Sequence, residues 1–141
     1  AQALARELGL MGCFARVPGG GAPVRGSVGA VFIDVFKPDK RPLNMKNVAM
    51  LYVVGPKGQG APGGHGPTIA ERGAFLQAVE DLGANAVRAT SEYNRLAGQR
   101  DLPRIDVVQW CLVSGGVYRH PESSKLDVAK ATVKGMKVGG A

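Results

Sequence analysis

The residues best suited to chemistry lie where an apolar run ends on two glycines. The run Val107–Val113 carries no charge, and Ser114-Gly115-Gly116-Val117-Tyr118 follows it directly. Uncharged runs rich in β-branched residues are typical of strands buried on both faces of a sheet. Glycines at the carboxyl end of such a strand allow a tight turn whose backbone N–H groups can surround a phosphate. The pattern therefore predicts an anion-binding loop, and a glycine turn needed only for packing is the alternative.

The histidines and cysteines do not have the spacing of a catalytic or metal site. Cys13 and Cys111 are far apart, which favours a reducing compartment over a disulfide framework or a zinc site, and Cys111 is expected in the core. His65 stands in a glycine-rich stretch, and His120 is expected to be exposed or to form a structural hydrogen bond. The sequence shows no paired carboxylates and no Ser-His-Asp or Cys-His set. We therefore expect no metal and no cofactor, and assign no catalytic residue.

Length and charge limit the class of protein and its partners. The chain has 141 residues, which suits one domain with a single core. Its 18 Lys and Arg against 11 Asp and Glu give a formal net charge of +7, which favours an anionic partner: a nucleic acid, a phosphorylated metabolite or an acidic protein surface. No apolar stretch approaches the roughly 20 residues of a membrane span, and no signal peptide opens the chain. These features predict an intracellular protein, cytoplasmic or nuclear, without a membrane partner.

The predicted elements alternate between helices and strands. A helix is expected over residues 1–10, and strands over 28–36, 47–54 and 107–113. A second helix is expected from the capping-box pattern Thr68–Glu71 to Leu96. A last helix follows another capping-box pattern, Ser124–Asp127. Residues 18–23 and 37–42 are expected loops, and residues 57–67 form a predicted flexible, Gly- and Pro-rich loop. This order is typical of α/β packing, with helices on the faces of a sheet.

Apolar spacing also predicts which face of each helix is buried. Gly83 is expected to break or bend the first of the two long helices. Its buried residues are expected to be Phe75, Val79, Leu82 and Ala86, and those of the last helix Leu126, Ala129, Val133 and Met136, with lysines opposite.

Five short sequence motifs, in order over residues 47–136, resemble those of the macrodomain family of ADP-ribose-binding modules. They are Val54-Gly55-Pro56 at a strand end, Leu96-Ala97 at a helix end, the loop Ser114–Tyr118, Pro121, and Val128-Ala129 in the last helix. The resemblance implies a three-layer α/β/α fold with a mixed sheet and helices on both faces, as one domain over residues 1–141. It also implies that Ser114, Gly115, Gly116 and Val117 hold the diphosphate of ADP-ribose, and that Tyr118 lies against the distal ribose.

The first half departs from the family pattern. The adenine-contacting Asp, the Asn-rich strand end and the Gly-rich loop before a helix are missing, so a chain that lacks its first strands is an alternative. The leading hypothesis is a module that binds ADP-ribose or a related nucleotide diphosphate, with ADP-ribose or an ADP-ribosylated protein as partner. A second hypothesis is a degenerate fold that serves as a structural, protein-interaction or nucleic-acid-interaction module. A third is an ADP-ribosyl hydrolase completed by an N-terminal loop.

Overall fold

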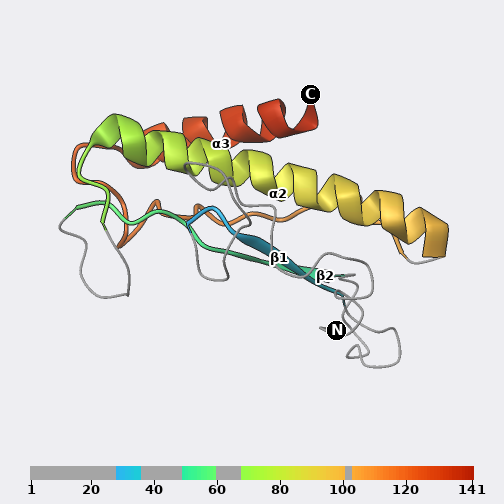
Figure 1. Ribbon diagram of the computed structural model, residues 1–141. Coiled ribbons are helices and arrows are strands. Elements are labelled where there is room, and N and C mark those ends of the chain that lie inside the picture. Colours follow the sequence, from blue (N-terminus) through green and yellow to red (C-terminus); the bar gives the residue numbers. More distant parts are fainter. Residues whose placement is uncertain (1–27, 36–48, 60–67, 101–102) are drawn as a thin grey trace.

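A computed structural model describes residues 28–35, 49–59, 68–100 and 103–141 of the chain (Figure 1). The described elements are β1 (Val31–Val35), β2 (Ala49–Val53), α2 (Arg72–Arg100) and α3 (Lys125–Gly140). The predictions for the helix over 1–10, the loops 18–23 and 37–42, and His65 lie outside the described residues.

The two predicted strands pair antiparallel and form a two-stranded sheet. Val31 and Ile33 are buried, and Leu51, the register partner of Ile33, packs against the same core. Because successive side chains of a strand point to opposite faces, Met50 and Tyr52 lie on the other face, where 43% and 52% of their surface is exposed. The sheet therefore turns one apolar face toward α2 and leaves a tyrosine and a methionine on the other.

Helix α2 packs Leu82 and Ala86 against the buried face of the sheet, and Phe75 and Val79 in a second cluster with Val128. Phe75, Val79, Leu82 and Ala86 are all buried, as their spacing of four, three and four predicts. The predicted start is wrong, because α2 begins at Arg72 and Ile69 forms an isolated β-bridge with Gly58. The predicted break at Gly83 is also wrong, because α2 continues through this residue.

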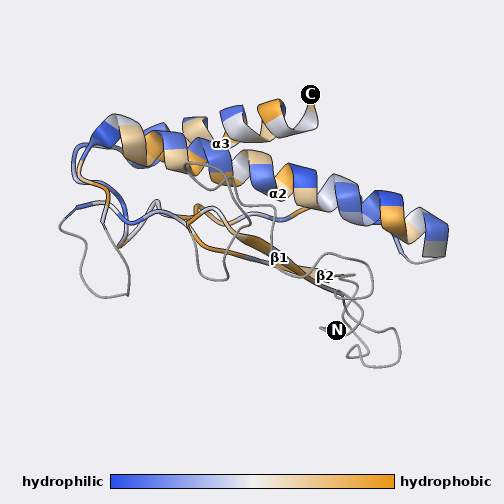
Figure 2. Cartoon of the chain, viewed as in Figure 1, coloured by the Kyte–Doolittle hydropathy of each residue, from blue (hydrophilic) through white to orange (hydrophobic). Residues whose placement is uncertain are grey.

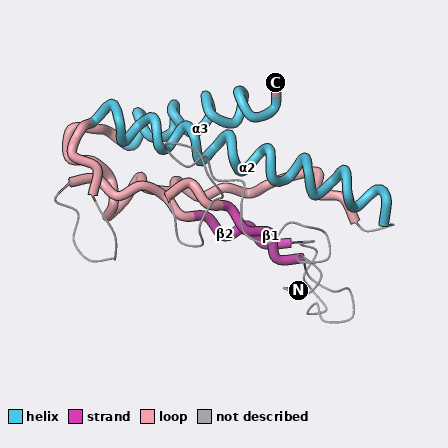
Figure 3. Tube along the Cα trace, in the orientation of Figure 1, coloured by secondary structure: helices cyan, strands magenta, loops and turns pink. Residues whose placement is uncertain are grey.

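Helix α3 packs along α2 on the side away from the strands (Figures 1 and 3). The two helices run parallel, since Arg72 meets Asp127 near their starts and Ala84 meets Gly139 further along. Glycines allow the close approach: a Cβ on Gly135 would stand 1.9 Å from the Glu80 carbonyl oxygen, and one on Gly83 2.6 Å from the Thr132 carbonyl oxygen. The described elements thus stack in the order sheet, α2, α3.

This glycine contact overturns the predicted buried face of α3. The buried residues are Val128, Thr132 and Gly135, whereas Leu126 and Val133 are 61% and 51% exposed. The face with the smallest side chains lets the helix backbones approach, and this contact takes precedence over burial of the larger aliphatic side chains.

The apolar run 107–113 is not a strand in the structure, so this prediction is wrong. Val107 is 85% exposed, and Cys111, expected in the core, is exposed as well. The Asn94 side chain holds the segment at its start, because its amide donates to the Ile105 carbonyl and its oxygen accepts from the Ile105 N–H, both at 2.8 Å. Neither β1 nor β2 pairs with residues 107–113. High β propensity alone does not make a strand without such pairing.

The described residues neither confirm nor contradict the predicted three-layer fold. The three-layer α/β/α arrangement stays a prediction, because the described residues contain two strands with a helix against one face of the sheet. Within the described part of the chain, neither helix combines the length and the apolar character that a membrane span requires.

Candidate nucleic-acid interface

The loop that follows the apolar run is tied to the end of β2. The Ser114 hydroxyl donates to the Pro56 carbonyl oxygen at 2.6 Å, and the Gly58 N–H donates to the Tyr118 carbonyl oxygen at 2.8 Å. Within the loop, the Arg119 N–H donates to the Gly116 carbonyl oxygen at 3.0 Å. These bonds give residues 114–119 a defined shape at the surface.

The two loop glycines have different roles. A Cβ on Gly115 would lie 2.4 Å from the Leu112 side chain, so this glycine is required for packing. Ser114 is also a packing residue, because a Cβ on Gly55 would lie 2.4 Å from its Oγ, and it adopts a left-handed φ of 62°. Gly116 faces open space, since a Cβ added there would meet no atom within 4 Å. The packing alternative therefore explains Gly115, and Gly116 is free to meet a ligand.

The outer part of the loop presents backbone donors and two side chains to solvent. Gly116, Val117 and Tyr118 are exposed. Their three N–H groups donate to no acceptor among the described residues. Successive free N–H groups in a turn suit an anion, and an exposed tyrosine ring suits a flat apolar ligand surface.

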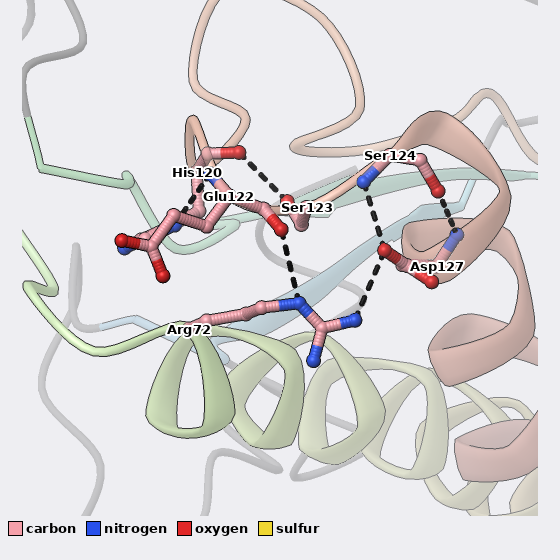
Figure 4. A network of polar contacts seen from close by, with 6 residues as sticks. All are labelled: Arg72, His120, Glu122, Ser123, Ser124 and Asp127. Atoms are coloured by element: carbon pink, nitrogen blue, oxygen red, sulfur yellow. Dashed lines mark hydrogen bonds and ion pairs between the residues drawn. The ribbon is translucent and has the colours of Figure 1, made fainter.

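His120 anchors the chain between the loop and α3 (Figure 4). Its Nε2–H donates to the Ala70 carbonyl oxygen at 2.7 Å, while its Nδ1 accepts from the Glu122 N–H at 3.1 Å. The ring is buried and lies 5.8 Å from the Phe75 ring. These contacts confirm His120 as a structural hydrogen-bond partner and leave it no access to a phosphate.

The predicted capping box at Ser124 and Asp127 is confirmed (Figure 4). The Asp127 N–H donates to Ser124 Oγ at 3.0 Å, and the Ser124 N–H donates to Asp127 Oδ2 at 2.9 Å. Arg72 of α2 joins the network through Asp127 Oδ2 at 3.0 Å and through the Glu122 carbonyl oxygen at 3.0 Å. The start of α3 is therefore tied both to its own cap and to α2.

This network makes the start of α3 sensitive to acid. The hydrogen bond from the Ser124 N–H, followed by that from Arg72, lowers the pKa of Asp127 below its ordinary value. A lowered folded-state pKa stabilises the fold above the unfolded-state pKa, and this stabilisation is lost as the pH falls through the folded-state pKa. We expect Asp127→Asn to be less stable than the wild type at pH 7 and to converge with it as the pH is lowered through this range. Urea midpoints measured from pH 7 to pH 2 test this, and a constant difference would contradict it.

Three lysines of α3 form a basic surface, here called the lysine face: Lys130, Lys134 and Lys137. Their spacing of four and three places them on one side of the helix, and all three are exposed. Lys134 lies 3.6 Å from Glu80, whereas Lys130 and Lys137 have no acidic partner among the described residues. The one acidic residue of α3, Asp127, is held by Arg72. Among the described residues, most of the positive charge on the lysine face is therefore not neutralised by an acidic side chain.

Two further cations lie in the chain between the loop and the lysine face. Arg119 and Lys125 also have no acidic partner among the described residues. Arg119 follows the exposed loop, and Lys125 opens α3. The spacing of four and three within α3 is the sequence signal for the lysine face. We call residues 114–137 the basic edge; this stretch of the chain includes the exposed loop, Arg119, Lys125 and the lysine face.

Comparison with known proteins identifies two relatives. The chain is 37% identical over 115 residues to the DNA/RNA-binding protein ALBA4 of Plasmodium falciparum (isolate 3D7), and 36% identical over 115 residues to ALBA4 of Plasmodium yoelii yoelii. The chain is similar to ALBA4. Each match covers 80% of this chain and 29% of the relative, so the chain spans less than a third of the length of these proteins. No protein-family model matches the chain, and no solved structure matches it.

The likeness to ALBA4 overturns the macrodomain assignment and, with it, ADP-ribose binding. Packing explains part of the motif resemblance. Gly55 of the Val-Gly-Pro motif packs directly against Ser114 of the loop. The five predicted site residues, Ser114 to Tyr118, do lie together in one surface loop. Their role in binding a ligand stays a prediction.

Proposed function

We propose that this chain is a nucleic-acid-binding module that contacts the phosphate backbone through its basic edge. The observation that carries the proposal is the similarity over 80% of the chain to relatives named as DNA/RNA-binding proteins. The net charge of +7 and the unpaired Lys130 and Lys137 on one helix face support it. Lysines that neutralise phosphates release counterions, which favours binding of any nucleic acid.

The loop 114–118 supplies the second kind of contact. The free N–H groups of Gly116, Val117 and Tyr118 accommodate a phosphate oxygen, as the glycine pattern predicts. The Tyr118 ring is exposed beside them. In this proposal the loop retains the anion-binding role predicted for it, and the anion is a backbone phosphate of the nucleic acid.

The salt dependence of binding tests the proposal. We expect the full chain to bind a fluorescein-labelled 12-nucleotide single strand, with affinity measured by fluorescence anisotropy. If four cations contact phosphates, the slope of log affinity against log salt is about −3, and the affinity falls roughly 50-fold between 50 and 200 mM salt. Binding that does not change with salt, or no binding at 50 mM, would contradict the proposal.

A further inference from the structure

The face of the sheet opposite α2 carries an exposed aromatic side chain in mid-strand. Tyr52 is the fourth of the five residues of β2, and Met50 precedes it by two positions on the same face. Both side chains are about half exposed. Strands β1 and β2 contain mainly hydrophobic residues (Figure 2). A half-exposed tyrosine ring in mid-strand offers an apolar face with a polar tip to a ligand.

No described helix covers this face. Helix α2 contacts both strands through their buried residues, such as Val31 and Ile33, and α3 contacts neither strand. The view in Figure 3 shows both helices on one side of the sheet. The face that carries Tyr52 therefore points away from the described helices.

The register of the sheet brings a second aromatic residue to the same position. Phe32 of β1 is the direct register partner of Tyr52. The register therefore pairs two aromatic residues, Phe32 and Tyr52, across the two strands. Aromatic residues on a sheet surface provide stacking positions for nucleobases.

From this arrangement we infer that the open face of the sheet binds single-stranded nucleic acid by stacking a base on Tyr52. The inference rests on the proposed function and specifies its substrate class. The bases of a duplex are stacked on one another, so only a single strand offers a free base face. A protein partner fits less well, because stable interfaces use about 20–30 residues a side, whereas the described residues of this face expose two large apolar side chains, Met50 and Tyr52.

Substitution of Tyr52 tests the inference with the full chain. We expect Tyr52→Ala to weaken binding of a 12-nucleotide single strand about tenfold, and to leave the affinity for a 12-base-pair duplex within about twofold of the wild type. Tyr52→Trp retains single-strand affinity because it keeps a flat ring. The slope of log affinity against log salt stays unchanged in Tyr52→Ala, because stacking releases no phosphate counterions.

Tyr52→Thr serves as a second variant, because threonine is β-branched and suits a strand but offers no ring. Its unfolding midpoint is compared with that of the wild type. If the wild type binds single strands and Tyr52→Thr binds them equally well, the stacking inference is wrong while the proposed function stands. Equal losses for single strand and duplex would also overturn it. If the wild type binds neither ligand, both proposals fail.

Discussion

Gly135→Ala is expected to destabilise the protein by about 2–3 kcal/mol, because the added methyl group has no room between α2 and α3. Its Cβ would stand 1.9 Å from the carbonyl oxygen of Glu80 and 2.7 Å from the carbonyl carbon. These are backbone atoms of α2, so a side-chain rotation cannot relieve the clash. The helices must separate, and packing around Val128 is lost. Urea-induced unfolding followed by circular dichroism measures the loss.

Gly98→Ala is the matched control. Gly98 also lies in a helix, but nothing comes within 4 Å of its Cβ position. Alanine has the higher helix propensity, so this variant should be as stable as the wild type or gain up to about 1 kcal/mol. Equal effects of the two substitutions would show that the close approach of α2 and α3 at Gly135 is absent in solution.

Reversal of two charges on the lysine face is expected to have the largest effect on binding. In Lys130→Glu/Lys137→Glu, two phosphate contacts are removed and two negative charges are placed against the nucleic acid. We expect the affinity for a single strand at 100 mM salt to fall at least about tenfold, and the slope of log affinity against log salt to become shallower by about 1.4. Both residues are exposed, so the helix should remain folded.

Arg95→Glu/Arg104→Glu changes the net charge by the same amount at a different place. Both arginines are exposed and already paired, with Glu92 and Asp106 respectively. Arg95 lies in the part of α2 beyond its contacts with α3. We expect a smaller loss of affinity and an unchanged slope. If both double variants lose affinity equally, the overall charge and not the lysine face governs binding.

The elements of this fold that depend on local pattern were predictable from the sequence. The composition of β1 and β2 predicted both strands, and the spacing of Phe75, Val79 and Leu82 in α2 matches the observed burial. The capping box at Ser124 was also predictable, because it is formed by residues three apart. These features require no knowledge of distant partners.

The errors occur where distant residues decide the outcome. The buried face of α3 is set by Gly135 meeting Glu80, a contact between residues far apart in sequence, so Val133 remains exposed although its spacing predicts burial. Residues 107–113 have the composition of a buried strand, but β1 and β2 do not pair with them. The glycines of the loop resembled a ligand motif, yet Gly115 is explained by its contact with Leu112.

Binding at the basic edge can be mapped residue by residue by nuclear magnetic resonance. The backbone amide signals of the isotope-labelled full chain are followed during titration with a single-stranded oligonucleotide. We expect shifts at Gly116 to Arg119 and along the exposed side of α3 from Lys130 to Lys137. Saturation of binding with these signals unmoved would contradict the proposal that the basic edge binds nucleic acid.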